Sequence, residues 1–345
     1  MTTPPSRFRW PAEWEHHDAT WLAWPHNEES WPGKFERIPP VFAEMVRTLV
    51  EGETVRILVQ SDAHRDEVRA LLADAGVDLG AVEFFVFATD DAWIRDYGPI
   101  FIEGVEPEGQ VALDWDYNAW GGKYPPWDRD AGVAARIAAA LGVPRRRPGM
   151  VLEGGSVDGD GEGTVLTTEQ CLLHPNRNPS LDRVAIEHRL KDFLGVEQVL
   201  WLGEGIVGDD TDGHVDDIAR FVAPGVVLAA EEPDPEDPNH GPLAENLSRL
   251  NSMSDARGLP LEVRTLPMPA ALFEQGCRLP ASYANFYVGN EAVLVPVFAD
   301  PADARALEVI GSCFPGRRTV GIDARDLVWG LGAFHCLTQQ QPGGA

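Results

Sequence analysis

Apolar residues in this chain fall into short continuous runs that alternate with segments of helical spacing. Thr20–Trp24 and Thr54–Val59 have the length and composition of buried strands. Between them, the apolar residues of Pro40–Val50 recur at the spacing of one helix face. Ser61 is placed to cap a following helix that ends near Gly76. The N-terminal part of the chain is therefore predicted to alternate strand and helix.

The alternation continues towards the C-terminus, although hairpin signals interrupt it. Glu83–Phe87 is predicted as another buried strand, and Asn290 as the turn of a hairpin. Further helices are predicted at Ala131–Leu141, Leu181–Leu194, Leu243–Ala256 and Ala302–Ile310. Further strands are predicted at Val165–Thr168, Val199–Leu202, Gly225–Ala230, Leu261–Leu266, Asn285–Val288, Ala292–Phe298 and Thr319–Ile322. These elements indicate an α/β protein, but not a plain doubly wound sheet.

No linker divides the chain, so residues 1–345 are predicted to form a single domain. Glu231–Pro238 is acidic and rich in proline, which prevents regular structure and predicts a long loop. An inert surface excursion is the simpler interpretation of this loop, and a mobile cover over a site is the alternative.

Five polar strings, each beside a predicted strand, recur about sixty residues apart. Asp96, Glu153, His214, Asn285 and Cys336 mark them. Such spacing suggests five pseudo-repeats whose polar loops point at one centre.

The composition is that of a folded protein with a large core. Of the 345 residues, 44% are hydrophobic and 24% are charged. No apolar run approaches the ~20 residues that span a bilayer. The N-terminus, Met1–Ser6, lacks the basic-then-apolar pattern of a secretion signal. We therefore expect a cytoplasmic protein that does not interact with membranes.

The chain is strongly acidic, with a net charge of −27 from 28 Lys and Arg against 55 Asp and Glu. Such a surface repels nucleic acid, because phosphate contacts need clustered cations. It would attract a small cation, although solubility, or an organism whose proteins are generally acidic, is the simpler explanation of the charge. The charge therefore argues against nucleic acid as a partner and permits a cationic substrate.

The four cysteines are scattered and form no Cys-x-x-Cys pair, so they match neither a disulfide framework nor a zinc site. Each is either a small buried residue or a reactive thiol. Cys336 differs from Cys171, Cys277 and Cys313 because glycines precede it and permit close approach of a ligand. Cys336 is therefore the candidate nucleophile.

His214 and Asp216 stand two residues apart in an acidic string. If the segment is extended, both side chains point to one face and can hold a cation and move protons. A solvated acidic turn and a calcium loop are the alternatives, and the calcium loop lacks its closing glutamate.

Trp93 and Asp96 form a second candidate pair for binding a planar cation. The indole can pack against the cation, and the carboxylate can accept two of its N–H groups. A core tryptophan beside a surface pair of Arg95 and Asp96 is the alternative.

Together these strings resemble the agmatine deiminase and bacterial-type peptidyl-arginine deiminase family of guanidine-modifying enzymes. The resemblance covers nearly the whole chain in the family's order. It is carried by Pro11–Glu15, Thr20–Pro25, Trp93–Pro99, Asn118–Tyr124, Glu153–Gly155, Thr211–Asp217, Ser282–Tyr287 and His335–Gln340. It implies a five-bladed, pseudo-symmetric α/β propeller of the pentein type, which agrees with the repeat spacing.

The resemblance also implies roles for individual residues. Cys336 would be the nucleophile, His214 the general acid and base, and Asp96 and Asp216 the carboxylates that bind the guanidinium. Trp93 would be a pocket wall, with supporting substrate contacts from Asp210 and Asn285. The implied reaction is hydrolysis of agmatine to N-carbamoylputrescine and ammonia, a reaction of putrescine biosynthesis that needs no metal or organic cofactor. The family further suggests a homodimer.

Guanidinium chemistry fits these roles, because two carboxylates can fix the plane of the cation while a thiolate adds to its carbon. The histidine then protonates the departing ammonia and later activates water. Two nearby carboxylates raise the pKa of a thiol. We therefore expect Cys336 to be a thiol until the substrate cation binds.

The chain departs from the family's usual nucleophile loop at Leu331, Ala333 and Phe334, and Asp212 and Asp217 stand where Asn is more frequent. These differences leave the choice of agmatine open. Arginine or peptidyl-arginine is the first alternative, and its carboxylate would need a cation at the pocket mouth, for which the candidates are Arg95, Lys123 and Arg129. Lower-ranked alternatives are a Cys–His–Asp amidase, which has no use for two extra carboxylates, and a non-catalytic cation-binding relative.

Overall fold

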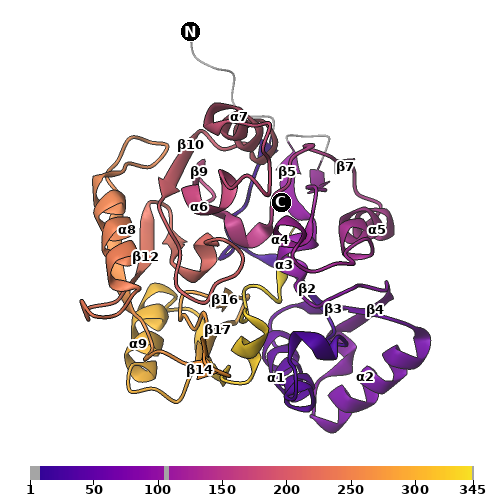
Figure 1. The fold of residues 1–345 in the computed structure, drawn as a ribbon. Coiled ribbons are helices and arrows are strands. Elements are labelled where there is room, and N and C mark those ends of the chain that lie inside the picture. The colour runs from indigo at the N-terminus through magenta and orange to yellow at the C-terminus, as the bar shows by residue number, and fades with distance from the viewer. Residues whose placement is uncertain (1–7, 105–108, 344–345) are drawn as a thin grey trace.

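The structure, a computed structural model, describes residues 8–104 and 109–343. The N-terminal segment considered above as a possible secretion signal lies outside these residues. Within the described ranges the strands form six sheets, and none of the six closes on itself. Figure 1 shows the groups of strands and helices following one another around the middle of the molecule in sequence order, from indigo to yellow.

The first sheet has the order β19-β2-β3-β4, so the last strand of the described residues pairs with β2. It consists of β2 (His17–Ala23), β3 (Thr54–Val59), β4 (Val82–Val86) and β19 (Gln339–Pro342). Helices α1 (Ile38–Leu49) and α2 (Asp62–Asp74) connect its three parallel strands. The hydroxyl of Ser61 accepts from the backbone N–H of His64, so the predicted cap is confirmed.

Four further sheets follow along the chain. They contain β1 (Phe8–Arg9), β5 (Ile100–Gly104), β6 (Gly109–Leu113) and β7 (Arg145–Arg146); β8 (Asp158–Gly159), β9 (Thr164–Thr168) and β10 (Gln198–Leu202); β11 (Ala219–Ala223), β12 (Val226–Glu231) and β13 (Glu262–Pro267); and β16 (Tyr287–Val288), β17 (Ala292–Val297) and β18 (Arg318–Asp323). The remaining sheet is the hairpin of β14 (Phe273–Glu274) and β15 (Cys277–Arg278). The other helices are α3 (Ile94–Tyr97), α4 (Ala119–Gly122), α5 (Val133–Leu141), α6 (Glu169–Leu172), α7 (Arg183–Leu194), α8 (His240–Ser252) and α9 (Asp303–Cys313).

One pairing pattern recurs in the larger sheets. Each has a central strand that pairs antiparallel with the strand before it and parallel with the strand after it, as in β5-β6-β7, β8-β9-β10, β11-β12-β13, β16-β17-β18 and β19-β2-β3. A helix lies between the two parallel strands, as crossover connections require. The five sheets are therefore variations of one supersecondary unit.

The five polar markers occupy equivalent places in these units. Asp96, Glu153, His214, Asn285 and Cys336 each precede the first strand of one unit, namely β5, β8, β11, β16 and β19. Because the units surround a common middle (Figure 1), this arrangement carries side chains from distant parts of the sequence to one place.

Several predicted elements differ from the structure in position or character. Glu83–Phe87 is predicted as a buried strand, but β4 lies at the edge of its sheet, and Val86 is 44% exposed. The segment His214–Asp216 is not extended, because a 3-10 turn begins directly after His214. Helix α8 begins and ends earlier than the predicted range Leu243–Ala256. The predicted loop Glu231–Pro238 has no helix or strand after β12 ends at its first residue.

The buried apolar residues form one large cluster and two smaller ones. The large cluster includes Trp93, Phe334 and Cys336, so the candidate nucleophile belongs to the main apolar core of the described residues. None of the helices in the described residues is both long and apolar enough to span a membrane.

Candidate active site

Gly155 lies where three predicted functional side chains approach one another. A Cβ atom added at this glycine would lie 2.6 Å from His214 Nδ1, 3.0 Å from Asp216 Oδ2 and 3.0 Å from Asp96 Oδ1. Cys336 Sγ lies 3.6 Å from the same Asp216 Oδ2. The structure therefore brings the four predicted catalytic residues together.

Cys336 is 5% exposed and is held by the side chain of Asn285. Asn285 Nδ2 donates to Cys336 Sγ at 3.1 Å and to Asp217 Oδ1 at 3.0 Å. Asn285 Oδ1 accepts from the backbone N–H of His335 at 3.0 Å and of Cys336 at 3.3 Å. One amide thus fixes both the sulfur and the backbone that carries it.

Asp96 is buried and has both carboxylate oxygens oriented by donors. Oδ1 accepts from the backbone N–H of Gly155 at 2.9 Å, and Oδ2 accepts from Trp120 Nε1 at 3.0 Å. Trp120 has a positive φ of 54°, an uncommon conformation for a bulky residue and one found at functional sites. We did not identify Trp120 as a site residue from the sequence, since only the fold joins it to Asp96.

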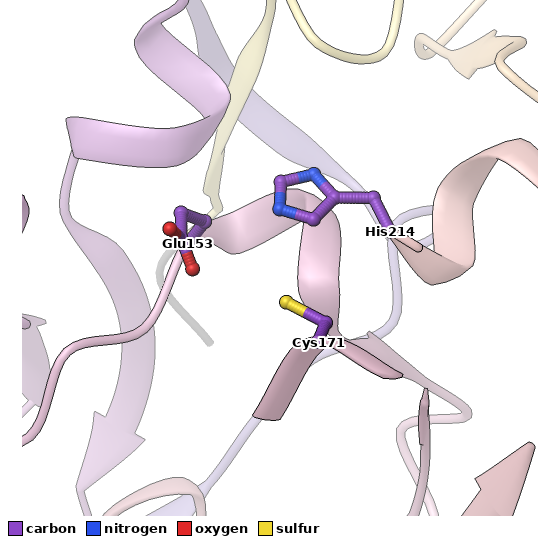
Figure 2. A group of neighbouring side chains, drawn as sticks. All are labelled: Glu153, Cys171 and His214. Carbon is purple, nitrogen blue, oxygen red and sulfur yellow. The ribbon is translucent and has the colours of Figure 1, made fainter. Parts of the chain in front are cut away.

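His214 is buried, and neither ring nitrogen has a hydrogen-bond partner in the protein. Nδ1 lies 3.8 Å from Asp96 Oδ1. Figure 2 shows the imidazole edge directed towards the carboxylate of Glu153 and the thiol of Cys171. Because buried polar atoms are normally paired, the free nitrogens mark His214 as a group that awaits a ligand.

Glu153, Cys171 and His214 are also the three metal-ligating side chains that come together within the part of the chain described, with ligand atoms within 4.8 Å of one another. Arg177 donates to Glu153 Oε1 at 2.7 Å. Its charge beside the group disfavours a second cation there. Glu153 and Cys171 are therefore better explained as neighbours that surround the His214 ring than as ligands of a metal ion.

The pKa shifts in the site follow from burial and crowded charges. Burial raises the pKa of the Cys336 thiol well above its usual value, and Asp216, Asp217 and Asp96 raise it further. Burial, together with the charges of Asp216 and Glu153, raises the pKa of Asp96 to about 6, although His214 acts to lower it. A thiol, rather than a thiolate, is therefore the resting form of Cys336 at neutral pH.

The pKa values of His214 and Asp216 shift in the direction opposite to the one that burial alone would cause. Burial alone would lower the pKa of His214, but the carboxylates of Asp96 and Asp216 help raise it well above its usual value. Burial would raise the pKa of Asp216, but His335, His214 and Arg220 lower it. The resting site thus holds a protonated imidazole beside an ionised carboxylate.

A cavity of about 990 Å³ leads to these residues. Asp96, Trp93 and Cys336 line it, while His214, Asp216 and Asn285 lie buried beside it. Trp93 packs against Trp31 with ring centroids 5.3 Å apart, which fixes its position as a wall. The Glu231–Pro238 loop contributes no residue to this lining.

Among the charged residues that line the cavity, acids outnumber Lys and Arg. The acids are Glu28, Glu29, Asp90, Asp91, Asp96, Asp130 and Asp210. Burial raises the pKa of Asp130 to about 8, so this one is neutral at pH 7. Asp210 accepts a hydrogen bond from the hydroxyl of Tyr124. The cavity is therefore suited to a cation.

The candidate cations for binding a substrate carboxylate are engaged elsewhere. Arg95 is buried and donates to the backbone oxygen of His335 and to Gln340. Lys123 lines the cavity but pairs with Asp212 at 2.9 Å. Arg129 also lines it, with Nε 3.8 Å from Asp90.

Comparison with known proteins agrees with the sequence resemblance. Residues 9–342 match the family of Porphyromonas-type peptidyl-arginine deiminase. An agmatine deiminase from Ectopseudomonas mendocina is 39% identical over 368 residues, which cover 99% of this chain and 98% of the relative. The structure of an agmatine deiminase from Enterococcus faecalis superposes with a TM-score of 0.90 at 35% identity, covering 99% of this chain and 98% of that one.

Two further structures extend the comparison. An agmatine deiminase of C. jejuni with substrate bound has a TM-score of 0.89 at 30% identity and covers 100% of this chain and 99% of its own. An amidinotransferase from Microseira wollei has a TM-score of 0.51 at 13% identity, with 97% and 96% covered, and shares the α/β fold alone. The family match and the full-length relatives lead to one conclusion: the chain belongs to the Porphyromonas-type peptidyl-arginine deiminase family.

Proposed function

We propose that this protein hydrolyses the guanidinium group of agmatine to N-carbamoylputrescine and ammonia. The observation that carries the proposal is the meeting of Cys336, His214, Asp96 and Asp216 beside a cavity lined by acids. Relatives named as agmatine deiminases along the whole chain support the same substrate.

Binding comes first in the proposed mechanism. The guanidinium enters between Asp96 and Asp216, whose ionised carboxylates accept its N–H groups and hold its plane. Trp93 supplies a flat wall against which the cation packs. The positive charge of the substrate offsets the carboxylates that raise the pKa of Cys336, so the thiol releases its proton to solvent and becomes a nucleophilic thiolate.

The chemical steps use the sulfur and the imidazole in turn. Cys336 Sγ adds to the guanidinium carbon, a C–N bond breaks, and His214 donates a proton to the departing ammonia. A covalent thiouronium remains on Cys336. The neutral imidazole then takes a proton from water, and the resulting hydroxide adds to the same carbon. Cleavage of the C–S bond releases the ureido product, and the proton of the added hydroxyl returns to the sulfur of Cys336.

The cavity favours agmatine over arginine and peptidyl-arginine. An α-carboxylate would enter among Glu28, Glu29, Asp90 and Asp210, and like charges repel in a partly desolvated cavity. The cations that line the cavity, Lys123 and Arg129, already face carboxylates. The terminal ammonium of agmatine suits these surroundings instead.

Ammonia release measured with agmatine, free arginine and a peptide ending in arginine tests this choice. We expect kcat/KM for agmatine to exceed the values for the other two by at least about 10²-fold, since a buried unpaired charge costs several kcal/mol. A preference for arginine or the peptide would overturn the substrate assignment while leaving the chemistry in place.

The five equivalent sheets also support the proposal that the protein is a five-bladed propeller of the pentein type. In this proposal residues 1–345 form one catalytic domain. Asp210 and Asn285 would then act as a substrate contact and a support of the nucleophile. Three further predictions accompany this proposal: the reaction contributes to putrescine formation, the protein is cytoplasmic, and it forms a homodimer.

A further inference from the structure

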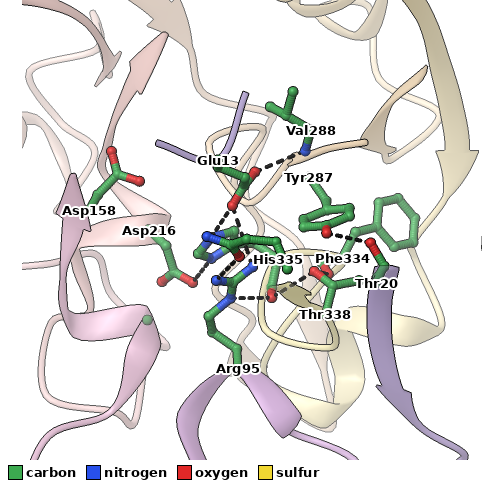
Figure 3. Close-up of polar contacts among 12 residues, drawn as sticks. Glu13, Thr20, Arg95, Asp158, Asp216, Tyr287, Val288, Phe334, His335 and Thr338 are labelled. Carbon is green, nitrogen blue, oxygen red and sulfur yellow. Dashed lines mark hydrogen bonds and ion pairs between the residues drawn. The ribbon is translucent and has the colours of Figure 1, made fainter. Parts of the chain in front are cut away.

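His335, the residue before the nucleophile, is inserted between two carboxylates. Its Nδ1 lies 2.6 Å from Asp216 Oδ2, and its Nε2 lies 2.8 Å from Glu13 Oε2. The side chain is 2% exposed. Figure 3 shows the ring lying between the two acids, close to the guanidinium of Arg95.

The geometry determines the charge of this ring. Burial raises the pKa of Glu13, but the permanent charges of Arg220 and Arg95 help lower it far below the usual range, so Glu13 is ionised. Burial likewise raises the pKa of Asp216, while His214 and Arg220 help lower it, so Asp216 is ionised as well. An ionised carboxylate only accepts hydrogen bonds. Both ring nitrogens of His335 must therefore donate, which makes the ring an imidazolium.

The bridge leaves Asp216 partly free. Its Oδ1 is buried and has no partner, and its Oδ2 is shared between His335 Nδ1 and the more distant Cys336 Sγ at 3.6 Å. A carboxylate offers about four lone-pair sites. One is occupied by the imidazolium, and the others remain for the N–H groups of a cation.

Other nearby cations do not provide this direct hydrogen bond. Arg220 binds Asp158 at 2.8 Å and Glu13 at 2.9 Å, so it acts on Asp216 through its field alone. His214 has no hydrogen bond to Asp216. Among the described residues, His335 is the one charged donor whose hydrogen bond orients this carboxylate.

We propose that His335 is a positioning residue of the guanidinium site: as an imidazolium bridging Glu13 and Asp216, it holds Asp216 in the orientation that receives the substrate cation. This role rests on the proposed function. It also ties the carboxylate to the nucleophile, because Asn285 Oδ1 accepts from the backbone N–H groups of both His335 and Cys336. The backbone positions of His335, which holds Asp216, and of Cys336 are therefore fixed by the same amide.

Two substitutions of His335 separate positioning from packing. Asn places its amide nitrogen near the site of Nδ1 and keeps a donor towards Asp216, whereas Gln reaches the site of Nε2 and keeps a donor towards Glu13. Both remove the charge, and Asn, the shorter side chain, removes more volume than Gln. Asp216 binds the guanidinium before and during the reaction, so its misplacement should act mainly on KM.

We expect His335→Gln to raise KM for agmatine by at least about tenfold with a smaller change in kcat, and His335→Asn to raise it clearly less. Equal increases in KM for the two variants, or a loss confined to kcat, would overturn the proposal. A purely structural role predicts the opposite order, because the shorter Asn leaves the larger gap in the packing.

The charge state of His335 provides a second test that does not depend on turnover. The sequence contains a single His-Cys pair, so selective labelling of histidine and cysteine identifies residue 335 by nuclear magnetic resonance. We expect both ring nitrogens of the wild-type protein to carry protons at neutral pH. A neutral ring would overturn the proposal even if neither variant folds, whereas failure of the wild type to hydrolyse agmatine would overturn the proposed function alone.

Discussion

Single atoms decide how closely the groups of this site can approach. Gly155 has no side chain, and the space that a methyl group would need is filled by His214, Asp216 and Asp96. His214 keeps both ring nitrogens free, and Asp216 keeps one oxygen free, although all are buried. Such unpaired atoms cost stability in the free protein. At the scale of residues, the site is built for a ligand that completes its hydrogen bonds.

Replacing Gly155 by Ala should displace these three side chains together. We expect kcat/KM for agmatine to fall by at least about 10²-fold, because displacements near 1 Å have effects of that size. Gly241 provides a matched control, since a methyl group there meets no atom within 4 Å and the residue lies in α8 away from the cavity. Steady-state kinetics would contradict the prediction if both variants kept wild-type activity.

The pH dependence of kcat/KM should report Asp96. Its pKa is raised to about 6, chiefly by burial, and it binds the guanidinium only as a carboxylate. Below about pH 6 the free enzyme therefore carries a protonated Asp96, and kcat/KM for agmatine should fall about tenfold per pH unit. A profile that stays flat down to pH 4.5 would show that Asp96 does not bind the cation.

The functional residues differ in how readily the sequence reveals them. Cys336, His214, Asp96 and Asp216 could be proposed because their strings resemble a known family, and the structure brings them together. The contact of Trp120 with Asp96 could not be proposed, since it joins segments with no shared local pattern. The same holds for the bridge formed by His335.

Among the structural elements, short connecting segments rather than long helices carry the catalytic side chains. His214 stands at the start of a 3-10 turn, and Cys336 lies in the turns between Leu331 and β19. Leu331 has a positive φ of 70°, where glycine would be unstrained. This segment is held in place by Asn285, whose amide makes the contacts with Cys336 described above.

Replacing Asn285 by Ala should therefore affect both stability and activity. The backbone N–H of Cys336 loses its acceptor, and that of His335 keeps only the backbone oxygen of Asn285, so we expect the free energy of unfolding to fall by about 1–3 kcal/mol. Because Cys336 Sγ also loses its donor, kcat should fall more than the stability loss alone explains. Chemical denaturation and kinetics measure the two effects, and Asn251→Ala on the exposed face of α8 is the control. Wild-type kcat in Asn285→Ala would contradict the role of this anchor.

The elements were predictable to the extent that apolar residues define them. The bounds of β3 are those predicted, and α2 begins after its predicted cap. β19 escaped prediction because its sequence is mostly glutamine, which shows no apolar alternation. It forms because β2 offers it a partner strand. Tertiary pairing overrides local propensity in this case.

Buried ion pairs join separate sheets at the scale of the whole molecule. Arg220 on β11 binds Glu13, which precedes β2, and Asp158 on β8, and it donates to the backbone oxygen of Phe286. Glu13 in turn receives Arg95 and His335. These ion pairs therefore tie several of the five units together behind the active site, and Figure 3 shows the part around Glu13, Arg95 and His335.

Removing Arg220 should destabilise the protein strongly. Arg220→Ala leaves two carboxylates buried without their partner, and we expect a loss of about 3–5 kcal/mol in the free energy of unfolding. The exposed pair of Arg305 and Glu308 is the control, and Arg305→Ala should cost less than about 1 kcal/mol. Equal losses in the two variants would contradict the importance of the buried network.

The arrangement of the whole molecule was only partly visible in the sequence. The spacing of Asp96, Glu153, His214, Asn285 and Cys336 indicated five repeated units, and each marker does precede the first strand of one sheet. The pairing of strands within each unit could not be derived, because it depends on contacts between distant segments. The buried network behind the site was hidden for the same reason.

The most direct test of the central claim is to trap the covalent intermediate. The protein is mixed with agmatine, quenched in acid during turnover, and digested for mass spectrometry. We predict that the peptide containing Cys336 gains the mass of agmatine less ammonia, that Cys313→Ala gives the same adduct, and that Cys336→Ala gives none. An adduct on another cysteine, or turnover without any adduct on Cys336 in rapidly quenched samples, would contradict the account.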